Sequence, residues 1–155
     1  MILWTARAWV GNRRDRHRSR AHPLASDDID WLTPFHDESF LRGVRLCRTP
    51  LHLVGIAGIT YGDTILIAPD APAQGLPWRR LLFHELVHVV QYEVLGLEAF
   101  LARYLRGWVT AGGRYRGIPL EADAYALEAK FSAEPESRFD VREAVKRRLA
   151  MREGR

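Results

Sequence analysis

The sequence predicts an α+β domain in which a small antiparallel sheet precedes a mostly helical C-terminal half. Three short apolar runs lie between residues 44 and 69 and are bounded by turn residues, which is typical of strands. After residue 78 the apolar residues recur at helical spacing instead. Strands first and helices afterwards are the order expected of an α+β fold.

Composition limits the class of protein. The chain has 155 residues, of which 47% are hydrophobic and 27% charged, as expected for one compact domain. No apolar run approaches the roughly 20 residues needed to cross a bilayer. Apolar residues 1–10 precede the basic cluster, which is not the order of a secretory signal, so we expect a cytoplasmic location and no membrane partner. The single cysteine, Cys47, has no cysteine partner, so any metal must be held by His and carboxylates.

The basic residues gather at the N-terminus. The net charge is +4, and six arginines against one aspartate already give +5 before residue 21. These residues are Arg7, Arg13, Arg14, Arg16, Arg18 and Arg20 against Asp15. A charge run at a terminus is usually a solvated tail, so the sequence does not favour nucleic-acid binding. We predict a basic flexible segment over residues 1–23 and a single domain over residues 24–155.

The predicted elements follow in order. Ser26 or Asp27 can cap a helix whose apolar residues reach Phe40, although Pro34 places its continuity in doubt. Residues 44–47, residues 51–56 and a third run from Tyr61 are predicted strands, the last with a Gly-Asp turn signal.

The helices of the C-terminal half are clearer. Residues 78–96 carry one broad apolar face and end at a glycine, and residues 97–109 continue as a second helix. Its inward residues are predicted to be Phe100, Leu101, Tyr104, Leu105 and Trp108. A third helix begins at Leu120, and residues 140–152 form a basic amphipathic helix.

The segment HELVH, which begins at His84, carries the chemistry. His84 and His88 lie one helical turn apart on the same face and can bind one ion, and Glu85 lies beside them to move a proton. Two unrelated histidines on a buried helix are the alternative, but polar residues on an otherwise apolar helix are costly unless they are paired. Gln91, one turn beyond His88, is either a hydrogen-bond partner of a ligand or a surface residue.

A third metal ligand must come from elsewhere in the chain. We favour Glu121, at the start of the helix in IPLEADAY, which can lie antiparallel to the helix with the two histidines. Asp123, Glu128 and Glu98 are its rivals. His17, His22, His36 and His52 have no paired spacing and are interpreted as ordinary surface or core residues.

Two further functions need residues of their own. A donor to the developing oxyanion is needed for hydrolysis, and Tyr115 and Tyr125 are the candidates nearest in sequence to Glu121. The strand TILIA, before the histidine helix, is a candidate edge on which an extended peptide could align.

These segments resemble a known family. HExxH completed by a downstream glutamate is the pattern of the gluzincin branch of the zincin metallopeptidases. GITYGDTI, a Pro-containing loop and RRLLFHELVHVVQ resemble the metallopeptidase-like core domain associated with extracellular contractile injection systems, over about residues 27–95. PLEADAYALE resembles the third-ligand helix of other small gluzincins.

The resemblance implies a zincin-like fold and a zinc metallopeptidase. By it, His84, His88 and Glu121 would bind Zn²⁺, Glu85 would be catalytic, and the substrate would be a peptide or protein. The chain departs from the family at Tyr125, where larger gluzincins often carry an aspartate that orients a histidine. It also lacks an obvious second lobe, which favours a narrow substrate range.

Two other functions compete with this one. A non-catalytic, zinc-stabilised protein-interaction domain would use the metal only to join its helices. A nucleic-acid binder would use the arginine segment and would bind in a salt-dependent way.

Overall fold

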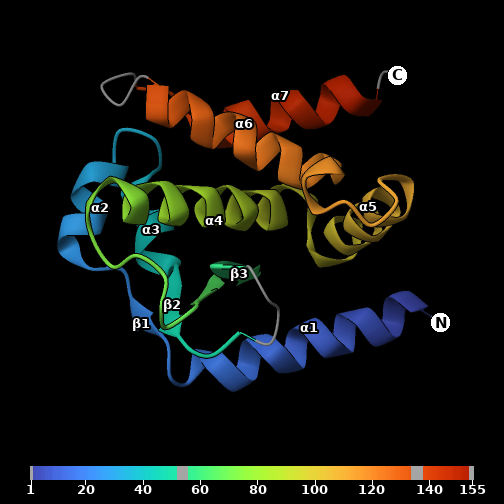
Figure 1. The fold of residues 1–155 in the computed structure, drawn as a ribbon, viewed down its shortest axis with the longest axis horizontal. Coiled ribbons are helices and arrows are strands. Elements are labelled where there is room, and N and C mark those ends of the chain that lie inside the picture. Colours follow the sequence, from blue (N-terminus) through green and yellow to red (C-terminus); the bar gives the residue numbers. More distant parts are fainter. Residues whose placement is uncertain (1, 52–55, 134–137, 154–155) are drawn as a thin grey trace.

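The computed structural model describes residues 2–51, 56–133 and 138–153, which form seven α-helices, one 3₁₀ helix and a four-stranded sheet (Figure 1). The N-terminal half contains α1 (Ile2–Arg18), β1 (His22–Pro23), α2 (Ser26–Leu32), α3 (Glu38–Gly43), β2 (Arg45–Arg48), β3 (Gly58–Tyr61) and β4 (Thr64–Ile67). The C-terminal half contains α4 (Gly75–Leu95), α5 (Leu97–Thr110), the 3₁₀ helix η1 (Tyr115–Gly117), α6 (Pro119–Ala133) and α7 (Val141–Glu153). The predicted α+β class and the four C-terminal helices are confirmed.

Helix α4 is the centre of the molecule. Figure 1 shows the sheet between α1 and α4, with α6 and α7 on the far side of α4. Leu82, Phe83 and Leu86 are fully buried, because α4 packs against β3, α5, α6 and α7. Phe83 also stacks on Phe131 of α6, with ring centroids 4.6 Å apart. Polar side chains on such a helix are therefore held away from bulk water.

The sheet is mixed, which corrects the predicted antiparallel sheet. Its strand order is β1-β2-β4-β3, in which β2 pairs with β4 in parallel and the other pairs are antiparallel. The turn Gly62–Asp63 joins β3 to β4, and Gly62 has a φ of 63°, which favours glycine. The hairpin places β4 between β2 and β3. In this position β4 is antiparallel to β3 and parallel to β2.

The predicted second strand lies mostly outside the described residues. That strand was placed at residues 51–56, of which residues 52–55 lie outside the described residues. Leu51 and Ile56 are not in a strand, and β3 is instead the segment just before the turn. TILI forms the inner strand β4, and the outer strand, which packs against α4, is β3. The prediction that TILIA forms the edge of the sheet was therefore wrong.

The N-terminal segment is helical over Ile2–Arg18, where the sequence predicted a flexible segment. Val10 is buried against the core, and Arg18 forms an ion pair with Asp63 in the hairpin turn. This packing on the sheet explains why a basic segment with good helix-forming residues is ordered. Among the described residues, no helix combines the length and the apolar character needed to cross a membrane.

Two further predictions need correction. The predicted helix from residue 26 to Phe40 is divided into α2 and α3, because Pro34 cannot donate the backbone hydrogen bond that would continue α2. On α5, Phe100 and Leu101 are buried as predicted, but Leu105 is 40% exposed and Trp108 45%. Both of these side chains were predicted to point inward.

Candidate metal centre

Three buried side chains from two helices converge on one point. His84 and His88 come from α4 and Glu121 from the first turn of α6, and each is less than 7% exposed. The two Nε2 atoms lie 3.2 Å apart, and Glu121 Oε2 lies 3.4 Å from that of His84 and 3.3 Å from that of His88. The structure thus brings together the three residues that the sequence predicted as ligands.

This triangle fits a metal ion. Zn–N and Zn–O bonds of about 2.0 to 2.1 Å in a tetrahedral site place neighbouring ligand atoms roughly 3.3 to 3.4 Å apart. The three observed separations are close to that value. In addition, the buried Glu121 Oε2 has no hydrogen-bond partner with suitable geometry among the described residues, although both imidazoles are near it. Ligand atoms aimed at a common ion rather than at one another explain both observations.

The protonation of His88 follows from its neighbours. Gln91 Nε2 donates to the carbonyl oxygen of Leu120 at 3.0 Å, which orients the amide oxygen Oε1 toward His88 Nδ1, 2.9 Å away. Because that oxygen can only accept, Nδ1 carries the proton and Nε2 of the neutral ring presents a lone pair to the centre. Gln91 is therefore the partner of a candidate ligand, which was one of its two predicted roles.

His84 is oriented in the same way by a carboxylate. Its Nδ1 lies 3.2 Å from Glu128 Oε2, and Arg80 holds the other oxygen of Glu128 at 3.0 Å. Tyr104 of α5 donates its hydroxyl to Glu121 Oε1 at 2.9 Å, which leaves Oε2 facing the two histidines. Each candidate ligand thus has a partner that fixes its orientation, as metal ligands in proteins usually do.

Some of these partners were missed from the sequence. Glu128 was considered only as a rival ligand, although it lies seven residues after Glu121 and so on the same face of α6. Tyr104 was assigned only to packing. The spacing in PLEADAYALE is the signal that could have identified Glu128 as a partner, whereas nothing in the sequence connects Tyr104 with Glu121.

The electrostatics of the cluster favour one cation. Burial lowers the pKa of His84, but the neighbouring carboxylates of Glu121 and Glu128 outweigh it and raise this pKa to about 9. Burial raises the pKa of Glu121, but His88 and then His84 bring it well below its usual range. The carboxylates therefore stabilise a positive charge at the centre of the cluster. A metal ion can supply this charge, and a proton on His84 can supply it when no metal is bound.

Glu85 lies beside the cluster and is held by the sheet. It is 4% exposed, and Thr60 of β3 donates its hydroxyl to Glu85 Oε2 at 2.7 Å. Gly58, also on β3, leaves room for the other oxygen, because a Cβ there would lie only 2.5 Å from Glu85 Oε1. Burial is the largest influence on the pKa of Glu85 and raises it, against the lowering effect of His88 and His84.

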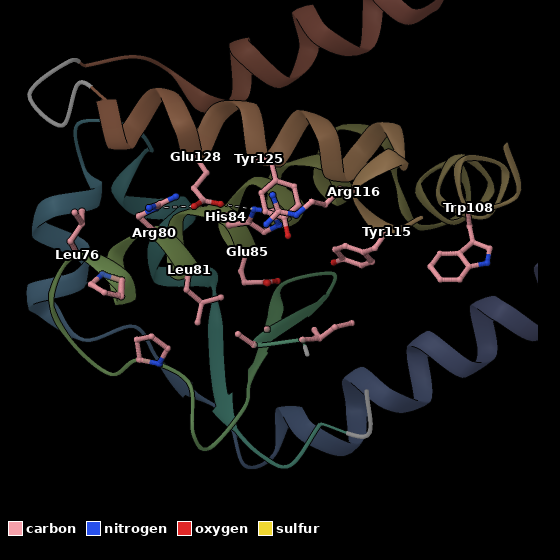
Figure 2. Close-up of a pocket in the computed structure, with 15 residues that line it drawn as sticks. Leu76, Arg80, Leu81, His84, Glu85, Trp108, Tyr115, Arg116, Tyr125 and Glu128 are labelled. Atoms are coloured by element: carbon pink, nitrogen blue, oxygen red, sulfur yellow. Dashed lines mark hydrogen bonds and ion pairs between the residues drawn. The ribbon is translucent and has the colours of Figure 1, made fainter. Parts of the chain in front are cut away.

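A pocket of about 880 Å³ opens onto His84 and Glu85 (Figure 2). One wall comes from the start of α4 and the loop before it, with Pro72, Leu76, Pro77 and Leu81. The opposite wall is formed by Trp108, Tyr115, Arg116 and Tyr125. The candidate ligand His84 and the neighbouring Glu85 therefore line a cleft large enough for a small-molecule or peptide ligand.

Both tyrosines predicted as possible donors line this pocket. In Figure 2 the Tyr115 side chain extends from η1 toward Glu85, and Tyr115 is also one of the groups that lower the pKa of Glu121. Tyr125 instead packs its ring on His84, with centroids 4.5 Å apart, and Arg116 lies over the same ring. Tyr115 has the better position for contact with a bound carbonyl group.

The remaining candidates lie elsewhere. Asp123 is buried but pairs with Arg148 and Arg152 of α7. His36 is buried against Phe40, His17 and His22 lie away from the cluster, and His52 lies outside the described residues.

Comparison with known proteins adds no relative. Neither the protein-family models, nor the curated proteins, nor the solved structures that were searched give a match to this chain.

Proposed function

We propose that this protein is a zinc-dependent metallopeptidase in which His84, His88 and Glu121 bind Zn²⁺ and Glu85 is the general base and acid. The observation that carries the proposal is the buried triangle of ligand atoms, 3.2 to 3.4 Å apart, whose two imidazoles have their Nδ1 atoms occupied by Gln91 and Glu128. Three protein ligands leave one position open, which is the arrangement of catalytic rather than structural zinc sites.

A zinc ion held by His84, His88 and Glu121 would act as a Lewis acid, which would polarise a carbonyl oxygen and make water a better nucleophile near neutral pH. Glu85 then accepts a proton from the attacking water and delivers it to the amine nitrogen as the C–N bond breaks. Its burial favours the first of these two transfers, because a carboxylate with a raised pKa is a stronger base toward the water proton. Thr60 keeps one oxygen in place while the other remains available for the proton.

Tyr115 is our choice for the donor to the oxyanion. Its side chain faces Glu85 across the pocket, whereas Tyr125 is engaged with His84 and Arg116 through its ring. A hydroxyl at this place stabilises the charge that develops on the carbonyl oxygen.

The peptide would lie along β3 instead of the predicted TILI strand. β3 is the outer strand of the sheet, and Gly58 lines the same pocket as Glu85. Ile59 and Tyr61 face β4 in hydrogen-bonded pairs of the hairpin, so the backbone groups of Gly58 and Thr60 point away from β4. An extended peptide can pair with such groups.

The test compares the wild-type chain with Glu85→Gln. Zinc content is measured on both proteins, and cleavage of a mixed peptide library is followed by mass spectrometry. We expect one bound zinc in each, cleavage by the wild type, and a loss of at least 100-fold in the variant. Glu143→Gln, an exposed glutamate on α7, is the matched control and should cleave normally.

Equal cleavage by the wild type and Glu85→Gln would remove the proposed mechanism. A zinc-loaded wild type that cleaves no peptide would favour the non-catalytic interaction domain instead, in which the metal only joins α4 to α6.

A further inference from the structure

We propose that Arg116 selects peptides that carry a carboxylate next to the cleaved bond. This inference rests on the proposed peptidase function and names its substrate class. Arg116 lies in η1 directly after Tyr115 and lines the pocket that opens onto His84 and Glu85. Figure 2 shows its side chain against the ring of Tyr125, on the same wall of the pocket.

The guanidinium of Arg116 lies close to the candidate metal centre. Its Cζ lies 4.5 Å from the centroid of the Tyr125 ring, and that centroid lies 4.5 Å from the centroid of the His84 ring. The guanidinium is thus no more than about 9 Å from the His84 ring. Stacking on an aromatic face holds an arginine in place and leaves its N–H groups free to bind a planar anion.

Arg116 differs from the other arginine of the pocket. Arg80 pairs with Glu128, but Arg116 forms no ion pair with a carboxylate within residues 2–51, 56–133 and 138–153. Glu85 and Glu121, the other acidic side chains of the site, are held by Thr60 and Tyr104. The pocket therefore offers a cation whose partner the described protein does not provide.

The charge of the loaded site points the same way. Glu85, Glu121 and Glu128 contribute three negative charges, which Zn²⁺ and Arg80 balance. Because the other charges balance, the guanidinium of Arg116 gives the pocket a net positive charge. An apolar wall on the opposite side strengthens the attraction for an anion, because it lowers the local dielectric constant.

A carboxylate near the scissile bond can reach Arg116. Consecutive Cα atoms are about 3.8 Å apart, so a group one or two residues from the reacting carbonyl lies roughly 4 to 8 Å from it. Two sources fit this chemistry: the side chain of an aspartate or glutamate, and the free C-terminus of the peptide. Both would form the paired hydrogen bonds that arginine makes with carboxylates.

The experiment uses the full-length, zinc-loaded chain and four fluorescein-labelled peptides. They share one sequence, with either Glu or Gln after the cleaved bond and either a free or an amidated C-terminus. We expect kcat/KM to be about tenfold higher for a carboxylate-bearing peptide, mainly through KM. A Glu-over-Gln preference identifies the side chain as the source, and a free-over-amidated preference identifies the C-terminus.

The variant Arg116→Gln should abolish the preference without changing zinc content, and Arg116→Lys should retain part of it. Arg114→Gln is the matched control, because Arg114 is exposed two residues away and hydrogen-bonds the Ala111 carbonyl instead of lining the pocket. Binding to the Glu85→Gln protein, measured by fluorescence anisotropy, gives a second readout that needs no turnover. There too, the carboxylate peptide should bind about tenfold more tightly, and only when Arg116 is present.

Cleavage of all four peptides with equal kcat/KM would overturn the inference and leave the peptidase proposal intact. If no peptide is cleaved, the peptidase proposal fails, and the anisotropy comparison still decides whether Arg116 binds carboxylates. Equal binding of Glu and Gln, free and amidated peptides in that comparison would refute the inference.

Discussion

Replacing Gly58 by alanine should disable Glu85 without touching a metal ligand. The added Cβ would lie 2.5 Å from Glu85 Oε1, 2.8 Å from Cδ and 3.0 Å from Cγ. To reach an ordinary contact of 3.4 Å, the carboxylate oxygen must move by about 0.9 Å. The far end of this side chain can move, so the chain should still fold.

That displacement has a calculable effect on catalysis. It breaks or lengthens the 2.7 Å hydrogen bond from Thr60, which contributes about 1.5 to 3 kcal/mol when the acceptor is charged. A reacting group misplaced by about 1 Å costs about 100-fold in rate, or about 2.7 kcal/mol of activation free energy. We therefore expect kcat to fall about 100-fold in Gly58→Ala, with zinc content unchanged.

The assay measures kcat on a cleaved library peptide together with zinc content and thermal unfolding. Gly43→Ala is the control, since a Cβ at Gly43 meets nothing within 4 Å. If Gly58→Ala binds zinc and keeps kcat within threefold of the wild type, then β3 does not set the position of the base, and the reasoning fails.

Three further outcomes are expected. Glu128→Gln should weaken zinc binding about 10- to 100-fold in chelator competition, because His84 loses the carboxylate that orients it; unchanged affinity would show that this contact is unimportant. Chelation of zinc by EDTA should lower Tm, and adding zinc back at 100 times its Kd should restore about 2.7 kcal/mol; a Tm indifferent to zinc would argue against the site. Burial holds the pKa of His36 at about 3, below the 6.5 of the unfolded chain, so unfolding takes up a proton between these pH values and stability falls as the pH falls through that range. In EDTA, the wild type should lose about 2 kcal/mol more than His36→Phe between pH 7 and pH 5, as measured by urea unfolding, and parallel curves would contradict this.

The features that depend on local periodicity were predictable from the sequence. The spacing of His84 and His88 on an apolar helix requires that both imidazoles share a face, and Glu121 opens the next helix that can lie antiparallel to it. The four C-terminal helices follow from the same 3.6-residue period, and the ends of α4 and α5 follow from the glycines after them.

The features that depend on long-range pairing were not predictable. Gly58 and Thr60 face Glu85 because β3 lies outside β4 in the sheet. The alternation of apolar and polar residues along a strand does not reveal this strand order. Leu105 and Trp108 have the helical spacing of core residues, but α5 lies at the edge of the molecule, where nothing among the described residues fully covers them. Tertiary position, not amphipathic pattern, determined their exposure.

The two functions of the candidate site come from separate halves of the chain. The three candidate ligands and the partners that orient them lie between residues 84 and 128. The residues that hold Glu85 in place, Gly58 and Thr60, lie on β3, which precedes α4 in the sequence. Metal binding and turnover can therefore be lost independently. A related chain with HELVH intact but a bulkier residue in place of Gly58 would be expected to keep its ion and lose its chemistry, so the glycine two positions before that threonine is as informative about activity as the histidines themselves.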